Sequence, residues 1–404
     1  GPFHRRTPSA PPRQAGMGSG ADARRAPEAR LDDAAVEAVL AQGALAPQLG
    51  WADGQTEREL QFPTLKAFGA RLCRQLGLAA DAASDEAALA ALTEPVHRIR
   101  VLEYYLPVFM WCCEQLQVHT TGFIKEHQPA SSGSSPRSPL DRAPVPNAPY
   151  AAHIHKDVRR QHPDTPAVVI GISAPQGCGK STIVGQLVQL FAAAGLKAVA
   201  LSTDDFYKTR AEQAALAQAN PGNPLLEFRG NAGSHDLELG AETVKALRAC
   251  TSKDAEVRCP RYDKSAHGGK GDRAAAAAWE VVRGPVDVVL LDGWSLGFQA
   301  VEPGAAEAVH PGLGKINELL PQYNEMWDAL CDAWIVFQVD DPRCVFDWRL
   351  QAEQRMRAGG RPGLSDAEIA DFVGRFMPAY EAYLPKLYAD GPPGAAGRDP
   401  SKVL

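Results

Sequence analysis

Lys180 and Ser181 end a short glycine-containing segment, Ala174-Pro-Gln-Gly-Cys-Gly-Lys-Ser, whose residue types suit the binding of phosphate. The backbone N–H groups of such a loop and the positive end of a following helix surround an anion. A lysine at this position reaches the β- and γ-phosphates of a nucleotide, and the next hydroxyl ligates Mg²⁺. We therefore expect ATP to be bound by Gly177, Cys178, Gly179, Lys180, Ser181 and Thr182.

The segment departs from the usual GxxxxGK[ST] pattern at its first position, where Ala174 stands in place of glycine. Alanine fits there only if the backbone keeps a negative φ, whereas Gly177 and Gly179 still allow close approach to phosphate. The apolar, β-branched run before the loop and the apolar residues at helical spacing after it predict strand, loop and helix. This context favours a phosphate-binding loop over an ordinary turn with a lysine by chance.

Carboxylates follow two further apolar runs of strand type. Asp204 and Asp205 end the segment AVALST, and Asp292 ends VDVVLL. We expect Asp204 to act as the base that orients and deprotonates an attacking hydroxyl, and Asp205 to cap the next helix. Asp292 and Ser181 are the expected ligands of Mg²⁺.

Two glycine-rich polar segments lie between the second and third expected strands. They suit a pocket for a small anion, since arginine offers paired donors to a carboxylate, although solvated loops have a similar composition. The candidate substrate-binding residues are Arg229, His235, Tyr262, Lys264 and Arg273. Arg349 and Arg355, beside a glycine-rich break, are expected to belong to a lid that closes over ATP.

The elements that must position these residues form an α/β fold. Strands are predicted at 167–173, 198–203, 286–292 and 334–339, alternating with helices, which indicates a mostly parallel sheet flanked by helices with its ligands at the carboxyl ends of the strands. The sequence divides into a leader at 1–30, a helical region at 31–127, a Ser/Pro-rich linker or insertion at 128–165 and a phosphate-loop domain at 166–404.

The composition excludes some classes of partner. A net charge of −6 gives no general attraction to nucleic acid or to an anionic membrane, and no apolar run is as long as a membrane span. The 8 cysteines include no CxxC pair, so mostly buried, reduced thiols are expected. We expect a monomer.

The motifs narrow the class of phosphate-loop protein. A GTPase would need an Asn-Lys-x-Asp motif, which the sequence lacks. A kinase for a small hydroxylated acceptor is favoured by three features together: an acid after the second strand, the polar segments before the third strand, and a basic lid. Other small-molecule kinases, and a nucleotide-binding regulator whose helical N-terminal region binds a partner, remain the alternatives.

At this level of detail the chain resembles the plant-type D-glycerate 3-kinase family. The shared motifs are YYLPVFMWCCEQ, SAPQGCGKST, STDDFY, NPGN-LLE-RGNAGSHDL, RYDKSAHGGKGDR, DGWSLGF, DAWIVFQVDDP, WRLQAEQRMR and GLSDAEIADFVGRFMPAYEAYLPKLY. The resemblance implies a phosphate-loop kinase fold and ATP- and Mg²⁺-dependent phosphorylation of D-glycerate at its 3-hydroxyl, within photorespiration. It also implies the plastid stroma, in keeping with the Arg-rich, acid-poor leader. The position of Asp204 matches the base of uridine kinases and phosphoribulokinases.

The chain departs from that family in three places. Asp292-Gly293-Trp294 stands where the family usually has Glu-Gly-Trp, and the Ser/Pro-rich segment looks inserted. The sequence ends at Leu404, where family members continue into a final strand, so we expect an exposed sheet edge.

Overall fold

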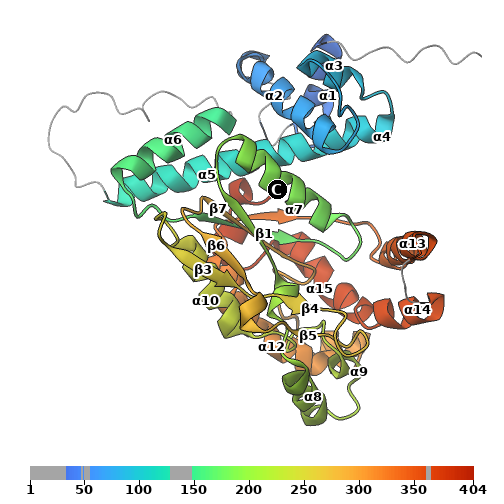
Figure 1. Ribbon diagram of the computed structural model, residues 1–404. Helices are drawn as coiled ribbons and strands as arrows, with labels where there is room; N and C mark the ends of the chain where they lie inside the picture. Colours follow the sequence, from blue (N-terminus) through green and yellow to red (C-terminus); the bar gives the residue numbers. More distant parts are fainter. Residues whose placement is uncertain (1–32, 47–48, 50–54, 128–147, 361–364) are drawn as a thin grey trace, which may run out of the picture.

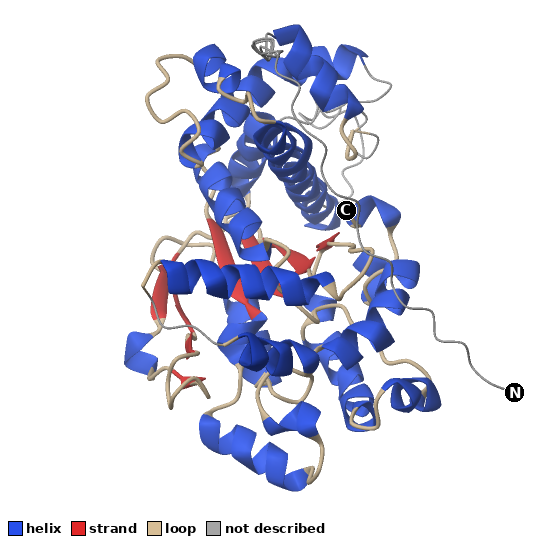
Figure 2. Ribbon diagram, turned by 90° about the vertical axis from the view of Figure 1, so that its right-hand side faces the viewer, coloured by secondary structure: helices blue, strands red, loops and turns tan. Residues whose placement is uncertain are grey.

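A four-stranded parallel sheet lies at the centre of the computed structural model, which describes residues 33–46, 49, 55–127, 148–360 and 365–404 (Figures 1 and 2). The strands are β1 (Val168–Ser173), β2 (Ala198–Ser202), β7 (Val288–Gly293) and β8 (Ala333–Val336), in the order β2-β7-β1-β8. They are the four strands predicted from the apolar runs, although β8 ends before its predicted end. The predicted α/β class is confirmed, and the carboxyl ends of all four strands meet at one edge of the sheet.

The sheet is buried on both faces, which explains why its strands read as continuous apolar runs. Val168, Ile170 and Ile172 of β1 share a core with α7 (Lys180–Ala193) and with α5 (Leu106–His127). Val169 points to the opposite face, which is covered by helices α10 (Leu237–Arg248), α12 (Leu313–Met326) and α15 (Met377–Asp390). Figure 2 shows helices on both sides of the strands.

The helical character predicted for 31–127 is confirmed for the described part of that region. Its elements are α1 (Asp33–Gln42), α2 (Gln55–Gln75), α3 (Asp85–Ala90), α4 (Pro95–Arg98), the π-helical η1 (Ile99–Tyr105) and α5. The π-helical stretch η1 leads directly into α5 and ends two residues before Pro107, which lacks an N–H donor. Phe109 contacts both Phe68 of α2 and Phe191 of α7, with ring centroids 4.9 and 5.2 Å apart. The region therefore shares its core with the sheet.

The segment predicted to be a Ser/Pro-rich linker or insertion, 128–165, contains a helix. Residues Ala148–Gln161 form helix α6, which packs along α5, instead of belonging to a linker. Its His155 is fully buried, with one ring nitrogen against Thr120 and the other against Asp287 at 3.1 Å. Arg159 donates to the same carboxylate at 2.5 Å, so α6 is fixed to the start of β7. The predicted leader at 1–30 and residues 128–147 lie outside the described residues.

The remaining elements lie around both ends of the sheet. They are η3 (Thr203–Phe206), α8 (Arg210–Ala219), α9 (Pro224–Glu227), β3 (Glu256–Cys259), β4 (Tyr262–Asp263), β5 (Asp272–Arg273), η4 (Ala276–Ala278), β6 (Glu280–Arg283), α11 (Pro303–Val309), η5 (Asp328–Leu330), α13 (Cys344–Ala358), α14 (Asp366–Gly374), α16 (Gly394–Gly397) and η6 (Pro400–Lys402). Strand β3 pairs with β6, and β4 with β5.

The edge of the sheet at β8 is not bare, contrary to the expectation from the sequence. Leu404 N donates to the Trp334 carbonyl at 2.9 Å, and Val336 N donates to the Leu404 carbonyl at 2.9 Å. Residues 403–404 thus satisfy donors and acceptors along β8. In the described part of the chain, no helix combines the length and the hydropathy needed to span a membrane.

Candidate active site

The phosphate-binding segment connects the end of β1 to the start of α7. Gly177 and Gly179 have φ of 87° and 95°, which explains the need for glycine at both positions. Among the described non-glycine residues only His267 has a positive φ, so the condition under which Ala174 was expected to fit is met. Gly177, Gly179, Ser181 and Thr182 are exposed, which leaves the loop open to a ligand.

Two residues from the C-terminal part of the chain hold this loop in place. The Tyr380 hydroxyl of α15 accepts a hydrogen bond from Gln176 N at 3.0 Å. Trp348 of α13 lies against Gly177 so closely that an added Cβ would stand 2.8 Å from the Trp348 Cβ. The loop conformation therefore depends on both helices as well as on its own glycines.

Lys180 points across the sheet edge to the acid at the end of β7. Its Nζ lies 2.5 Å from Asp292 Oδ1, which also accepts from the Ser202 hydroxyl at 3.3 Å. Burial alone would lower the pKa of Lys180, but the carboxylates of Asp292 and Asp204 raise it above its usual value. The lysine is thus a permanent cation at the position expected from the sequence.

The glycine after Asp292 is required by a close contact. A Cβ at Gly293 would stand 2.7 Å from the Thr203 hydroxyl oxygen. Thr203 begins η3, the short turn that carries the two aspartates. The Asp-Gly pair therefore brings the end of β7 against the turn that positions the expected base.

Asp204 and Asp205 have different partners. Lys264 Nζ lies 2.5 Å from Asp204 Oδ2, whereas Arg261 Nη1 donates to Asp205 Oδ2 at 3.0 Å. Burial tends to raise the pKa of Asp204, but the charges of Lys264 and Lys180 bring that pKa below its ordinary value. Asp204 is therefore an ionised carboxylate whose pKa is influenced by Lys180 of the phosphate loop, whereas Asp205 is ion-paired with Arg261.

Sequence reasoning missed Tyr207. Its hydroxyl hydrogen-bonds the Asp204 side chain, and its ring stacks on His235 with centroids 4.5 Å apart. The signal was present in the motif STDDFY, where a tyrosine follows Asp204 by one turn of η3. Tyr207 helps to orient the expected base.

Of the five residues predicted to bind substrate, only Lys264 forms an ion pair with Asp204 in the described part of the chain. Arg229 donates to the Gly269 carbonyl at 3.0 Å and lies over the ring of Tyr262 at 5.4 Å. Arg273 donates to Asp236 at 3.0 Å. In this structure both guanidiniums brace loops, instead of pointing freely into a pocket as expected.

His235 is also placed differently from the expectation. It is buried, its Nδ1 lies 2.9 Å from the Tyr323 hydroxyl, and burial lowers its pKa to about 4. A neutral imidazole in the wall of the site cannot attract an anion by charge. Its role here is to support the ring of Tyr207.

Helices α13 and α14 form the segment that was expected to be a lid. Arg349 of α13 donates to Glu353 at 3.2 Å and lies over the Phe372 ring of α14 at 5.6 Å, while Arg355 is exposed. Ser365 caps the start of α14, where it forms a capping box with Glu368. The structure does not bring either arginine to Lys180, although α13 itself contacts the loop through Trp348.

A parallel sheet with a phosphate-binding loop after its first strand, an acid after the second and another after the third defines a kinase of the phosphate-loop class. The family model of phosphoribulokinase and uridine kinase matches residues 169–298. The chain belongs to this family.

Relatives agree with that assignment. The chloroplastic D-glycerate 3-kinase of Arabidopsis thaliana is 42% identical over 337 residues, which are 83% of this chain and 63% of that protein. The uncharacterized kinase mug58 of Schizosaccharomyces pombe is 33% identical over 239 residues, 57% of this chain and 85% of that protein. The solved structure of D-glycerate 3-kinase from Cryptococcus neoformans is 28% identical with a TM-score of 0.54, covering 72% of this chain and 93% of that one.

Proposed function

We propose that this protein transfers the γ-phosphate of ATP to the 3-hydroxyl of D-glycerate and releases 3-phosphoglycerate and ADP. The observation that carries the proposal is an ionised Asp204 that faces Lys180 of the phosphate loop at the carboxyl edge of the sheet. The choice of acceptor follows the Arabidopsis and Cryptococcus relatives, which are both D-glycerate 3-kinases.

The loop from Gly177 to Thr182 binds the phosphates of ATP through its backbone N–H groups, and Lys180 exchanges part of its contact with Asp292 for phosphate oxygens. The donor set around Asp292 suits Mg²⁺, because a buried carboxylate and the exposed hydroxyl of Ser181 are hard oxygen ligands. Ser181 and Asp292 would hold this ion, which supplies charge neutralisation at the phosphates. Mg²⁺ keeps several waters and phosphate oxygens as ligands, so few protein groups suffice.

The transfer is direct. The 3-hydroxyl oxygen forms a bond to the γ-phosphorus as the bond from that phosphorus to the β–γ bridging oxygen breaks, and the hydroxyl proton passes to Asp204. Tyr207 and Lys264 keep the carboxylate oriented and ionised until the proton arrives. No covalent intermediate with the enzyme is formed.

Lys264 is the cation best placed to bind the glycerate carboxylate, because it is the predicted substrate residue that lies beside the base. Arg349 and Arg355 join the transferring phosphate when α13 moves with its lid, since both lie on the helix that contacts the loop. We further propose that the protein works in the plastid as a monomer and serves photorespiration.

The test is ADP release from Mg·ATP with and without D-glycerate, followed by identification of the phosphorylated product. Strong stimulation by D-glycerate with 3-phosphoglycerate as the product is the expected result. Stimulation by uridine or another hydroxylated acceptor instead would retain the kinase class and replace the substrate. ATP binding with no acceptor-stimulated turnover would favour a nucleotide-binding regulator.

A further inference from the structure

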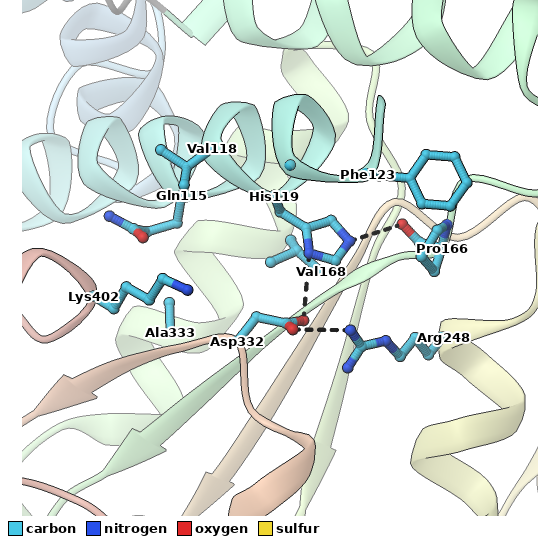
Figure 3. Close-up of a pocket in the computed structure, with 11 residues that line it drawn as sticks. Gln115, Val118, His119, Phe123, Pro166, Val168, Arg248, Asp332, Ala333 and Lys402 are labelled. Atoms are coloured by element: carbon cyan, nitrogen blue, oxygen red, sulfur yellow. Dashed lines mark hydrogen bonds and ion pairs between the residues drawn. The ribbon is translucent and has the colours of Figure 1, made fainter. Parts of the chain in front are cut away.

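A cavity of about 330 Å³ lies at the edge of the sheet opposite to the phosphate loop (Figure 3). Pro166 and Val168 line it at the start of β1, and Asp332 and Ala333 at the start of β8. Helix α5 forms its other wall. Because the phosphate loop follows the opposite end of β1, this cavity is separate from the active site.

The lining of the cavity carries more positive than negative charge. It includes the cations Arg248 and Lys402 and a single carboxylate, Asp332. Both carboxylate oxygens are occupied, since Oδ1 accepts from Arg248 Nη2 at 2.9 Å and Oδ2 from Val169 N at 2.8 Å. Asp332 therefore has little capacity left to bind a further cation, and the cavity keeps an excess of donors.

Lys402 has the strongest unused donor. Its ammonium extends into the space between α5 and the strand starts (Figure 3), and within the described part of the chain it forms no hydrogen bond or ion pair. The nearby Asp399 lies outside the lining. Its pKa is lowered first by hydrogen bonds that its Oδ1 accepts from Ser401 and, to a smaller extent, by the charge of Lys402, with which it forms no ion pair among the described residues. Arg248 uses one N–H of each terminal nitrogen, for the Leu330 carbonyl and for Asp332, and keeps others for a ligand.

His119 completes the polar wall from α5. One ring nitrogen lies 3.3 Å from the Pro166 carbonyl, and the other lies 3.8 Å from Asp332. Burial lowers the pKa of His119 although Asp332 opposes the change, so the empty cavity holds a neutral ring there. An anion placed beside it would favour protonation and add a third cation to the site.

We propose that this cavity binds a small oxyanion, a phosphate or a carboxylate, whose oxygens accept hydrogen bonds from Lys402 and Arg248. Charge-assisted hydrogen bonds of lysine and arginine to such oxygens are among the strong ones in proteins. The bound anion bridges the N-terminal helix α5 and the far edge of the kinase sheet, so it also stabilises their packing.

A glycine in the wall allows the site to be blocked without disturbing its charges. Gly122 of α5 lines the cavity, and a Cβ added to it would meet no atom within 4 Å. A leucine side chain at this position would take up part of the cavity while favouring the helix. The matched control is Gly374 in α14, another helical glycine whose added Cβ meets nothing.

The experiment is calorimetric titration of the full chain with inorganic phosphate at constant ionic strength. The phosphate loop is first saturated with Mg²⁺ and the β,γ-imido analogue of ATP, so that phosphate cannot enter there. Lys402→Gln and Gly122→Leu are compared with Lys386→Gln and Gly374→Leu, since Lys386 pairs with Asp390 away from the cavity. A parallel titration with acetate distinguishes a phosphate site from a carboxylate site.

The expected result is one anion per chain, weakened about 10- to 100-fold by Lys402→Gln and abolished by Gly122→Leu, with both controls unchanged. Saturation by acetate with the same dependence on Lys402 would assign the site to carboxylates. Binding equal in all five proteins, or none up to about 10 mM in the unmodified chain, would overturn the proposal.

Discussion

The two aspartates just after β2, Asp204 and Asp205, differ in role because their charged partners differ. Asp204 faces two lysines, and Asp205 is held by Arg261. Burial raises the pKa of Asp205, whereas the lysines lower that of Asp204. Only the first carboxylate is both ionised and turned to the phosphate loop.

We expect Asp204→Asn to lower turnover by about 10²–10⁴-fold, because the amide cannot accept the hydroxyl proton. Nucleotide binding should persist, since Lys180 and the loop are untouched. Steady-state kinetics and calorimetry of ATP binding measure the two effects. Asp205→Asn is the matched control, which should change stability more than turnover. Near-normal turnover of Asp204→Asn would mean that Asp204 is not the base.

Lys264→Met should move the acid limb of the kcat/KM profile to higher pH. The reason is that Lys264 helps to lower the pKa of Asp204, and the base works only when ionised. The activity of the unmodified enzyme therefore persists to lower pH than that of the variant. Steady-state rates measured across pH test this prediction, with the exposed Lys253→Met as the control. An acid limb that stays at the same pH in Lys264→Met would show that the base is another group.

At the scale of elements, the close contact between the end of β7 and η3 constrains the site. Gly293→Ala should lower the free energy of unfolding by about 1–3 kcal/mol, because the new Cβ meets buried Thr203 at 2.7 Å. It should also lower turnover, since the displaced turn carries Asp204. Urea unfolding and kinetics measure both.

The matched control is Gly185→Ala in α7. Its added Cβ meets nothing within 4 Å, so the change should raise stability by up to about 1 kcal/mol. If Gly293→Ala proved as harmless as this control, the turn would not depend on the close approach.

The elements themselves were largely predictable from the sequence, because buried parallel strands are uninterrupted apolar runs and the loop has its own pattern. The partners of the charged side chains could not be predicted from the sequence. Arg229 and Arg273 looked like free cations in the sequence, yet loop carbonyls and Asp236 bind them in the fold. Such pairings join residues far apart in the chain, and no local pattern records them. Helix α6 was missed because the Ser/Pro-rich stretch before it obscured its start.

At the scale of the whole molecule, stability should depend on pH through Asp328. This carboxyl is fully buried between Asn324 and Gly297 N, and burial raises its pKa to about 7. A raised pKa in the folded state favours the protonated form, so this contribution to stability is complete below about 3.8 and is lost as the pH rises to about 7.

We expect the free energy of unfolding to lose on the order of 2–4 kcal/mol from Asp328 over that pH range, in addition to the effects of other groups. Asp328→Asn removes the titration, so its unfolding free energy should fall less steeply with pH than that of the unmodified chain. The exposed Asp254→Asn is the control. Equal slopes in all three proteins would mean that Asp328 titrates normally.

The strand order β2-β7-β1-β8 also determines when each strand can find its partner as the chain is synthesised. Both early strands, β1 and β2, pair with β7, and about 115 residues lie between the end of β1 and Val288. At about 5–20 residues per second that is about 6–23 s during which the nascent Val168–Ser173 segment has no strand partner. A ribosome that stalls before β7 therefore presents an unpaired apolar strand to chaperones and to other nascent chains.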